Sequence, residues 1–191
     1  MTRCARYGRV LALTALVALA GCTPQPETII VIDSINALDA EGHPIGDLFS
    51  DVCRGAPPSC VVTNDNVLVT ATARAEDPYT DISRFGDIVI ERYRVTYVRA
   101  DGRNTPGVDV TYPFDGATNF RVPVGGFASQ QFMAVRPQAK LEPPLSNLAG
   151  GRGAIVISVL AQIEFFGRQL VTDRAVAARG SINITFADFA G

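Results

Sequence analysis

The sequence predicts an all-β protein, an antiparallel β-sandwich of about seven to nine strands that follows an N-terminal helical signal peptide. Two observations predict this fold class. Apolar and polar residues alternate in several segments after residue 27, as in strands with one buried face, and polar turns separate these segments. No segment after the signal shows a sustained 3.6-residue periodicity, so we expect few helices.

The first 22 residues have the layout of an export signal. Arg3, Arg6 and Arg9 precede an apolar run from Val10 to Gly21, and a charged segment followed by a hydrophobic one is typical of a signal peptide. As a helix the run would span about 18 Å at ~1.5 Å per residue, whereas a membrane-spanning helix must cross about 30 Å of hydrocarbon. Its length therefore excludes a transmembrane helix.

A cysteine ends this signal. The residues Leu19-Ala20-Gly21-Cys22 resemble the lipobox of bacterial lipoproteins. The resemblance implies that the Cys22 sulfur receives a diacylglycerol, that the signal is cut before this residue, and that at least two acyl chains give stable anchoring to a membrane. Thr23, in place of Asp, implies sorting to the outer membrane of a Gram-negative cell. The alternative is an ordinary secretory signal that happens to contain a cysteine.

This signal divides the chain into three parts. We expect a signal peptide at residues 1–21, a tether at 22–27, and one β-sandwich domain at 28–191 with loop insertions at 36–60 and 138–153. All 19 acidic residues follow Cys22 and three of the 17 basic residues precede it, so the mature chain has 14 basic residues and a net charge of about −5. No basic stripe is present, which argues against nucleic acid as a partner.

The cysteine content agrees with export. Cys4 leaves with the signal, and Cys53 and Cys60 flank a segment that contains a Gly-Ala-Pro-Pro turn. An exported compartment permits disulfides, so we predict a local Cys53–Cys60 bridge that pins a loop. The alternatives are a zinc half-site, for which His43 is the one further candidate ligand, and a redox pair; zinc requires more ligands, and redox pairs normally enclose two residues.

Several segments in the first part of the domain are expected to be strands. Residues 28–35 are rich in β-branched residues, and residues 67–75 alternate. Residues 87–102 contain the clearest strand, which ends in a turn at 100–103; Val89, Tyr93, Val95 and Tyr97 fall on one face, and Arg92, Arg94 and Thr96 on the other. We expect residues 107–112 to return as its partner strand, and residues 119–124 and 132–137 to form shorter strands.

The last part of the chain predicts a hairpin. Residues 138–153 are a long connection with one helical turn, which we expect to cross between the sheets. The segment at residues 154–167 is long enough, and contains enough β-branched residues, to form a central strand. Residues 180–189 place Ile182, Ile184 and Phe186 on one side, with Ser181, Asn183 and Thr185 opposite.

Part of this pattern resembles a known family. Residues 91–102 (ERYRVTYVRADG) resemble the third strand and turn of fibronectin type III and related immunoglobulin-like domains, and the strand pair over residues 154–187 is similar to their last two strands. The resemblance implies an immunoglobulin-like or fibronectin type III-like sandwich. The chain departs from the family in having no tryptophan and no cysteine pair that joins two core strands, so a jelly-roll or C2-like sandwich remains an alternative.

Enzyme motifs are absent, and we expect no catalytic activity. The one histidine, His43, lies in a loop beside a proline, and the sequence has no G-x-S-x-G motif to supply a nucleophile. Residues 150–154 (GGRGA) lack the Lys-Ser/Thr pair of a phosphate-binding loop.

An acidic loop is the metal candidate. Glu76, Asp77, Asp81 and Asp87 lie between two predicted strands, and loop carboxylates can bind calcium. Because the spacing matches no EF-hand loop, we favour a solvated loop that Arg84 partly neutralises. We therefore predict no cofactor, with calcium at Asp77, Asp81 and Asp87 as the alternative.

Two functions fit these observations. The first is a non-enzymatic lipoprotein of the cell envelope that acts as a structural or protein-interaction module, with the membrane, through its acyl chains, and envelope proteins as partners. The second is a lipoprotein that binds a carbohydrate or calcium through loops at one end of the sandwich. The second function predicts clustered aromatic side chains, and the candidates are Tyr79, Phe85, Tyr112 and Phe114.

Overall fold

The computed structural model describes residues 27–54, 60–77, 86–151 and 155–189. The predicted signal peptide, Cys22 and nearly all of the tether lie outside these ranges. Within them, no helix is both long enough and apolar enough to span a membrane.

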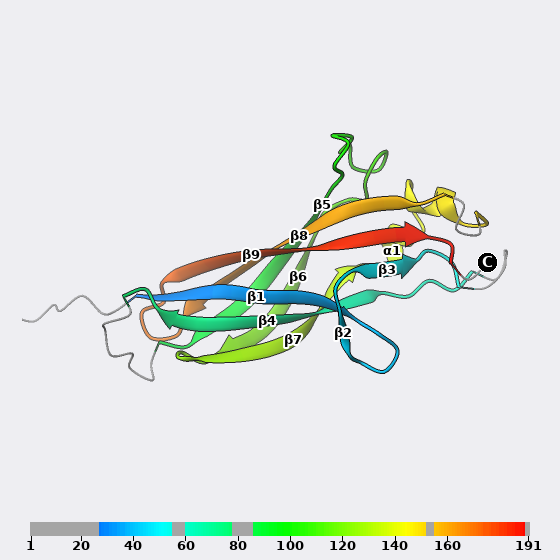
Figure 1. The fold of residues 1–191 in the computed structure, drawn as a ribbon. Coiled ribbons are helices and arrows are strands. Elements are labelled where there is room, and N and C mark those ends of the chain that lie inside the picture. Colours follow the sequence, from blue (N-terminus) through cyan, green and yellow to red (C-terminus); the bar gives the residue numbers. More distant parts are fainter. Residues whose placement is uncertain (1–26, 55–59, 78–85, 152–154, 190–191) are drawn as a thin grey trace, which may run out of the picture.

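The described chain forms two β-sheets (Figure 1). One sheet has the strand order β2-β1-β4-β7 and the other the order β3-β9-β8-β5-β6, which confirms the predicted all-β class. The strands are β1 (Thr28–Leu38), β2 (Pro44–Ile45), β3 (Leu48–Asp51), β4 (Asp65–Ala75), β5 (Ile88–Val98), β6 (Phe114–Val122), β7 (Gly126–Val135), β8 (Ile157–Gln169) and β9 (Ala175–Ala187). The expectation of antiparallel pairing needs one correction, because β3 runs parallel to β9.

Alternation along the strands builds one hydrophobic core between the two sheets. In β4, Val67, Val69, Ala71 and Ala73 are buried, and the residues between them are half-buried. The ring of Phe132 in β7 makes edge-to-face contacts with Tyr93 of β5, Phe120 of β6 and Phe165 of β8, at centroid distances of 5.1 to 5.5 Å. Such pairs contribute about 0.5–1.5 kcal/mol each beyond the area that they bury, so this ring ties one sheet to the other.

A β-bulge in β5 corrects the predicted face of this strand. The pairing of β5 with both of its neighbours shifts between Ile90 and Arg92. Ile88 and Ile90 are therefore buried before the shift and Tyr93 after it. Val89, which the sequence placed on the buried face, is half-buried on the opposite side of the strand.

The segments next to β5 also differ from expectation. Residues 107–112 form no strand, because the backbone N–H groups of Val108, Asp109 and Val110 donate to the Thr105 carbonyl within a closed turn. The partner strand is β6, which begins at Phe114. The predicted loop at 36–60 contains the short strands β2 and β3.

The long connection between β7 and β8 crosses from one sheet to the other, as predicted. It contains the one-turn helix α1 (Pro137–Lys140) and the 3-10 helix η1 (Leu145–Leu148). β8 then lies at the centre of its sheet and pairs with β9 as a hairpin. In β9, Ile182, Ile184 and Phe186 are buried, which confirms the predicted face.

The strands give the molecule two ends. The near end is where β1 begins at Thr28, beside the turn that joins β8 to β9 and the turn that joins β6 to β7 (Figure 1). The far end is where β5 and β9 end and where β4 and β8 begin. β8 has 13 residues, so at ~3.3 Å per residue about 40 Å separates the two ends.

Candidate interaction surface at the far end

The most elaborate loop of the described chain lies at the far end. It joins β5 to β6 through residues 99–113 and projects from the body of the molecule (Figure 1). Long connections without secondary structure are uncommon in compact domains and are often functional. The side chains of this loop are held together by its own polar contacts.

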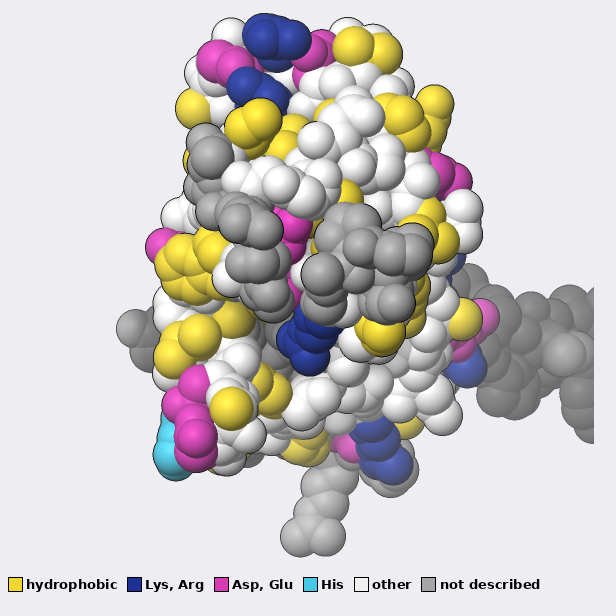
Figure 2. All heavy atoms as spheres, turned by 90° about the vertical axis from the view of Figure 1, so that its right-hand side faces the viewer, with side chains coloured by type: hydrophobic (Ala, Val, Ile, Leu, Met, Phe, Trp, Pro, Cys, Tyr) yellow, Lys and Arg dark blue, Asp and Glu magenta, His cyan; other side chains and the backbone are white. Residues whose placement is uncertain are grey.

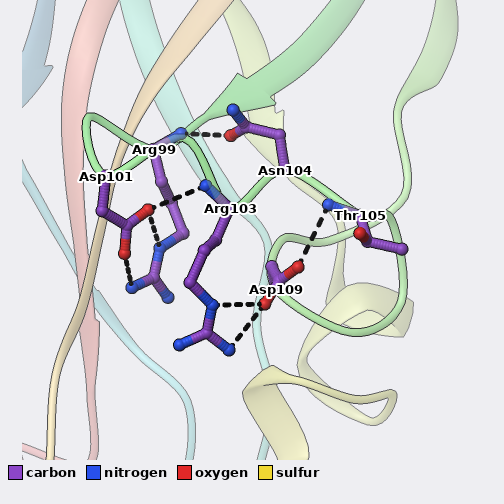
Figure 3. Close-up of polar contacts among 6 residues, drawn as sticks. All are labelled: Arg99, Asp101, Arg103, Asn104, Thr105 and Asp109. Atoms are coloured by element: carbon purple, nitrogen blue, oxygen red, sulfur yellow. Dashed lines mark hydrogen bonds and ion pairs between the residues drawn. The ribbon is translucent and has the colours of Figure 1, made fainter.

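The first half of the loop folds around Asp101 (Figure 3). The Asp101 carboxylate accepts two hydrogen bonds from the Arg99 guanidinium, at 3.1 and 2.5 Å, and one from the backbone N–H of Arg103 at 3.1 Å. The Asn104 side-chain oxygen accepts the Arg99 backbone N–H at 2.6 Å. Gly102, at φ +80°, allows the sharp turn between them.

The second half folds around Asp109. The Asp109 carboxylate accepts hydrogen bonds from the Arg103 Nε at 3.0 Å and from the Thr105 backbone N–H at 3.3 Å (Figure 3). This carboxylate is buried although the Arg103 side chain is exposed. Arg103 therefore links the two halves, because its backbone binds Asp101 and its side chain binds Asp109.

The electrostatics of the loop keep both carboxylates charged. The Arg99 guanidinium holds the pKa of Asp101 below its usual value. Burial raises the pKa of Asp109, but hydrogen bonds from Thr105 and Arg103 outweigh burial, and the net shift of this pKa is downward. A loop fixed in this way loses little conformational freedom when a partner binds, and preorganisation of this kind improves affinity.

The tip of this ordered loop exposes apolar side chains. Val108 is 65% exposed and Tyr112 is 50% exposed. A Cβ atom at Gly107 would lie 2.6 Å from the Tyr112 ring, and Gly107 has a φ of +78°, so glycine suits this turn with the ring packed over it. The loop thus offers one aliphatic and one aromatic group on a rigid support.

Further apolar side chains are exposed on other segments at the far end. Phe49 of β3 and Phe189, which follows β9, lie edge to face at 6.1 Å, and both are exposed. Exposed Ile45, Val61, Leu141, Ile155, Val156 and Leu160 belong to the same end. Figure 2, which faces this end, shows hydrophobic side chains among charged groups. In this view the hydrophobic side chains form several separate patches, with charged and other polar groups between them.

A shallow groove of 390 Å³ lies at the base of the loop on the outer face of β8 and β9. Arg99 and Ala100 line it from the loop, Leu160 and Asn183 from the sheet, and Asp47 from the segment before β3. Asn183 donates a hydrogen bond to Asp47 at 3.2 Å. The groove is open and its lining mixes polar and apolar side chains, which suits a side chain of a partner better than a buried small molecule.

The predicted disulfide is confirmed. Cys53 and Cys60 are bonded, with their Cα atoms 5.0 Å apart, in the connection from β3 to β4 at the far end. A backbone bridge between Arg54 and Val61 closes the same connection. His43 lies in an exposed turn, and its Nδ1 is 3.2 Å from a carboxylate oxygen of Asp39.

The calcium candidates fall at the near end. Asp87 is buried, and its two oxygens are occupied: one accepts the Val124 N–H at 3.0 Å and the other the Arg121 guanidinium at 2.5 Å. Burial raises the pKa of Asp87, but these hydrogen bonds outweigh it and lower the pKa overall. Asp81 lies outside the described residues. Among the described side chains, including Glu76 and Asp77, no group of three metal-ligating residues gathers.

The aromatic candidates for a carbohydrate site do not gather in the described structure. Phe114 is buried in the core, where Arg136 stacks on it at 4.9 Å. Tyr112 is exposed on the loop at the far end. Tyr79 and Phe85 lie outside the described residues.

Comparison with known proteins places the chain in no family. No protein-family profile matches it, and no curated protein is significantly similar to it in sequence.

Proposed function

We propose that this protein is a lipid-anchored component of a bacterial cell envelope that binds a partner protein through its far end. In this proposal Cys22 carries acyl chains, the outer membrane holds them, and residues 22–27 connect them to the near end. The export signal and the lipobox-like sequence support the anchor. The domain itself performs no catalysis.

The strand order supports an immunoglobulin-like sandwich for this domain. Apart from the short β2 and β3, the strands β1, β4 and β7 form one sheet, and β5, β8 and β9 belong to the other. These correspond to the A, B and E strands and the C, F and G strands of the immunoglobulin arrangement. The remaining strand, β6, lies beside β5. Immunoglobulin-like domains carry many different functions on their loops, so the fold alone does not specify the partner.

One observation supports the interaction role most strongly: most of the apolar side chains exposed by the described chain lie at the end opposite the predicted tether. Val108 and Tyr112 stand there on a loop fixed by two carboxylates, and Phe49 and Phe189 form a second exposed pair. A surface that projects away from a membrane anchor meets partners from the surrounding compartment. Aromatic groups on a rigid support are frequent centres of binding energy.

The test is affinity purification from envelope fractions with three variants of the full-length protein. Val108→Asp combined with Tyr112→Asp should lose the co-purifying partner, because each change replaces an exposed apolar side chain of the loop with a charge. Ser129→Asp, on an exposed position of β7 that pairs with Thr70 in the middle of β4, is the control and should keep it. The Cys22→Ser protein, which has no site for the lipid, should no longer be found in the membrane fraction.

The proposal fails if the far-end variant retains the same partner as the control. The lipid anchor is a separate part of the proposal, and it is contradicted if mass spectrometry finds an unmodified cysteine at the N-terminus of the mature chain.

A further inference from the structure

Apolar side chains are also exposed at the near end, where their position points to a different partner. Phe127, near the start of β7, is 73% exposed. Leu170 and Val171 lie in the turn between β8 and β9 and are exposed as well. Both elements lie beside the beginning of β1 (Figure 1).

The backbone holds these positions firmly. The N–H of Leu170 donates to the Asp87 carbonyl at 2.9 Å, which ties the turn between β8 and β9 to the start of β5. The N–H of Gly125 donates to the Ala73 carbonyl at 2.7 Å, which ties the turn before Phe127 to β4. The exposed apolar groups therefore belong to the rigid body and move with it.

The charges around them are largely paired. Arg174 pairs with Glu27, Arg168 with Asp173 at 2.9 Å, and Arg121 with Asp87 at 2.5 Å. Arg74 is exposed on the neighbouring part of β4. Moving a paired charge toward a medium of low dielectric costs less free energy than moving a single charge.

The length of the tether limits where this end can go. Thr28 lies six positions after Cys22, and six residue steps reach at most about 20 Å when fully extended. A lipid at Cys22 would hold the start of β1 within that distance of the bilayer surface. A short link raises the effective concentration of the near end at that surface to the millimolar range, so a weak contact is sufficient.

We infer that Phe127, Leu170 and Val171 rest in the interfacial layer of the bilayer to which the protein is anchored. This inference depends on the proposed lipid anchor and adds an orientation to it. The domain stands on its near end with the far end about 40 Å away from the lipid. Aromatic and aliphatic side chains at the headgroup level are the usual means by which anchored proteins contact a membrane surface.

Tryptophan substitutions test this orientation by fluorescence. The chain has no tryptophan of its own, so all tryptophan emission comes from the substituted position. Phe127→Trp and Val171→Trp place reporters at the near end, and Val108→Trp is the matched control at a far-end site whose exposure lies between those of the two reporters. Each variant is made in the lipidated full-length protein and bound to zwitterionic phosphatidylcholine vesicles, with and without brominated acyl chains. Flotation of the vesicles measures the anchor independently.

We expect brominated lipid to quench most of the emission at positions 127 and 171 and to leave the emission at position 108 unchanged. If the protein floats but either near-end reporter is no more quenched than the control, the orientation is wrong and the anchor stands. If the protein does not float, the anchor is wrong and the inference falls with it.

Discussion

Gly167 shows how a single residue shapes this fold. It lies in β8 opposite the bulge of β5, where Ile90 pairs with Gly167 and Arg92 with Phe166. A Cβ atom on Gly167 would lie 2.8 Å from the Ile90 Cα atom and would also clash with the Val89 carbonyl oxygen. Since these are backbone atoms, the neighbour cannot move aside as a flexible side chain could.

We therefore predict that Gly167→Ala destabilises the protein by roughly 1–3 kcal/mol, the usual cost of forcing atoms into packed space. Gly46→Ala is the control, because a Cβ atom there meets nothing within 4 Å, and it should stay within about 0.5 kcal/mol of the wild type. Urea unfolding of the two variants and the wild type measures both effects. Equal stabilities for the two variants would contradict the role assigned to Gly167.

The carboxylate of Asp109 gives a pH-dependent prediction at the same scale. Its pKa is lowered in the folded protein, so the unfolded chain, with a pKa near 3.9, takes up its proton first as the pH falls. The contribution of Asp109 to stability is thus fully present above the unfolded pKa and is lost as the pH falls through the folded pKa. Asp109→Asn should lower the melting temperature at pH 7, and this difference should shrink below about pH 4. A difference that is the same at pH 7 and pH 3 would show that the charge of Asp109 does not hold the loop.

At the scale of elements, helix α1 fixes the connection between β7 and β8 to the strands β3 and β4. The Lys140 side chain is fully buried and lies 2.9 Å from an Asp65 oxygen of β4. It also donates to the Asp51 carbonyl of β3 at 2.8 Å, and Ser50 donates to the same Asp65 oxygen at 2.6 Å. One ammonium group thereby joins α1 to a strand of each sheet.

Removing one partner of the Lys140–Asp65 ion pair should lower the free energy of unfolding considerably. Lys140→Met leaves the Asp65 carboxylate buried without its cation, and we expect a loss of about 3–5 kcal/mol. Adding Asp65→Leu to the first change should recover a large part of this loss, because two apolar groups need no partner. Chemical unfolding of the single and double variants measures the coupling, and strictly additive losses would argue against a direct interaction.

The elements that the sequence predicted well are those with uninterrupted alternation, namely β4, β8 and the end of β9. The bulge in β5 was missed because one extra residue inverts the pattern, and Gly167, the residue that permits it, is far away in sequence. The four residues of β3 were missed because a parallel pairing with β9 depends on the end of the chain. Two cysteines close in sequence predicted their bridge, whereas the loop at the far end depends on the Arg103 side chain meeting Asp109, which no local spacing reveals.

At the scale of the whole molecule, the two ends differ in what they expose. The near end carries a few apolar groups among paired charges, and the far end carries a rigid loop, the disulfide and most of the exposed apolar side chains of the described chain. This difference supports the proposed function, in which the membrane lies at the near end and a protein partner binds the far end.

Site-specific photo-cross-linking in intact cells tests this polarity most directly. A photoreactive amino acid is placed at position 108, on the far end, or at position 127, on the near end, and the products are separated by mass after irradiation. We expect protein adducts from position 108 and none from position 127, which should face lipid. Protein adducts from position 127 with none from position 108 would contradict it.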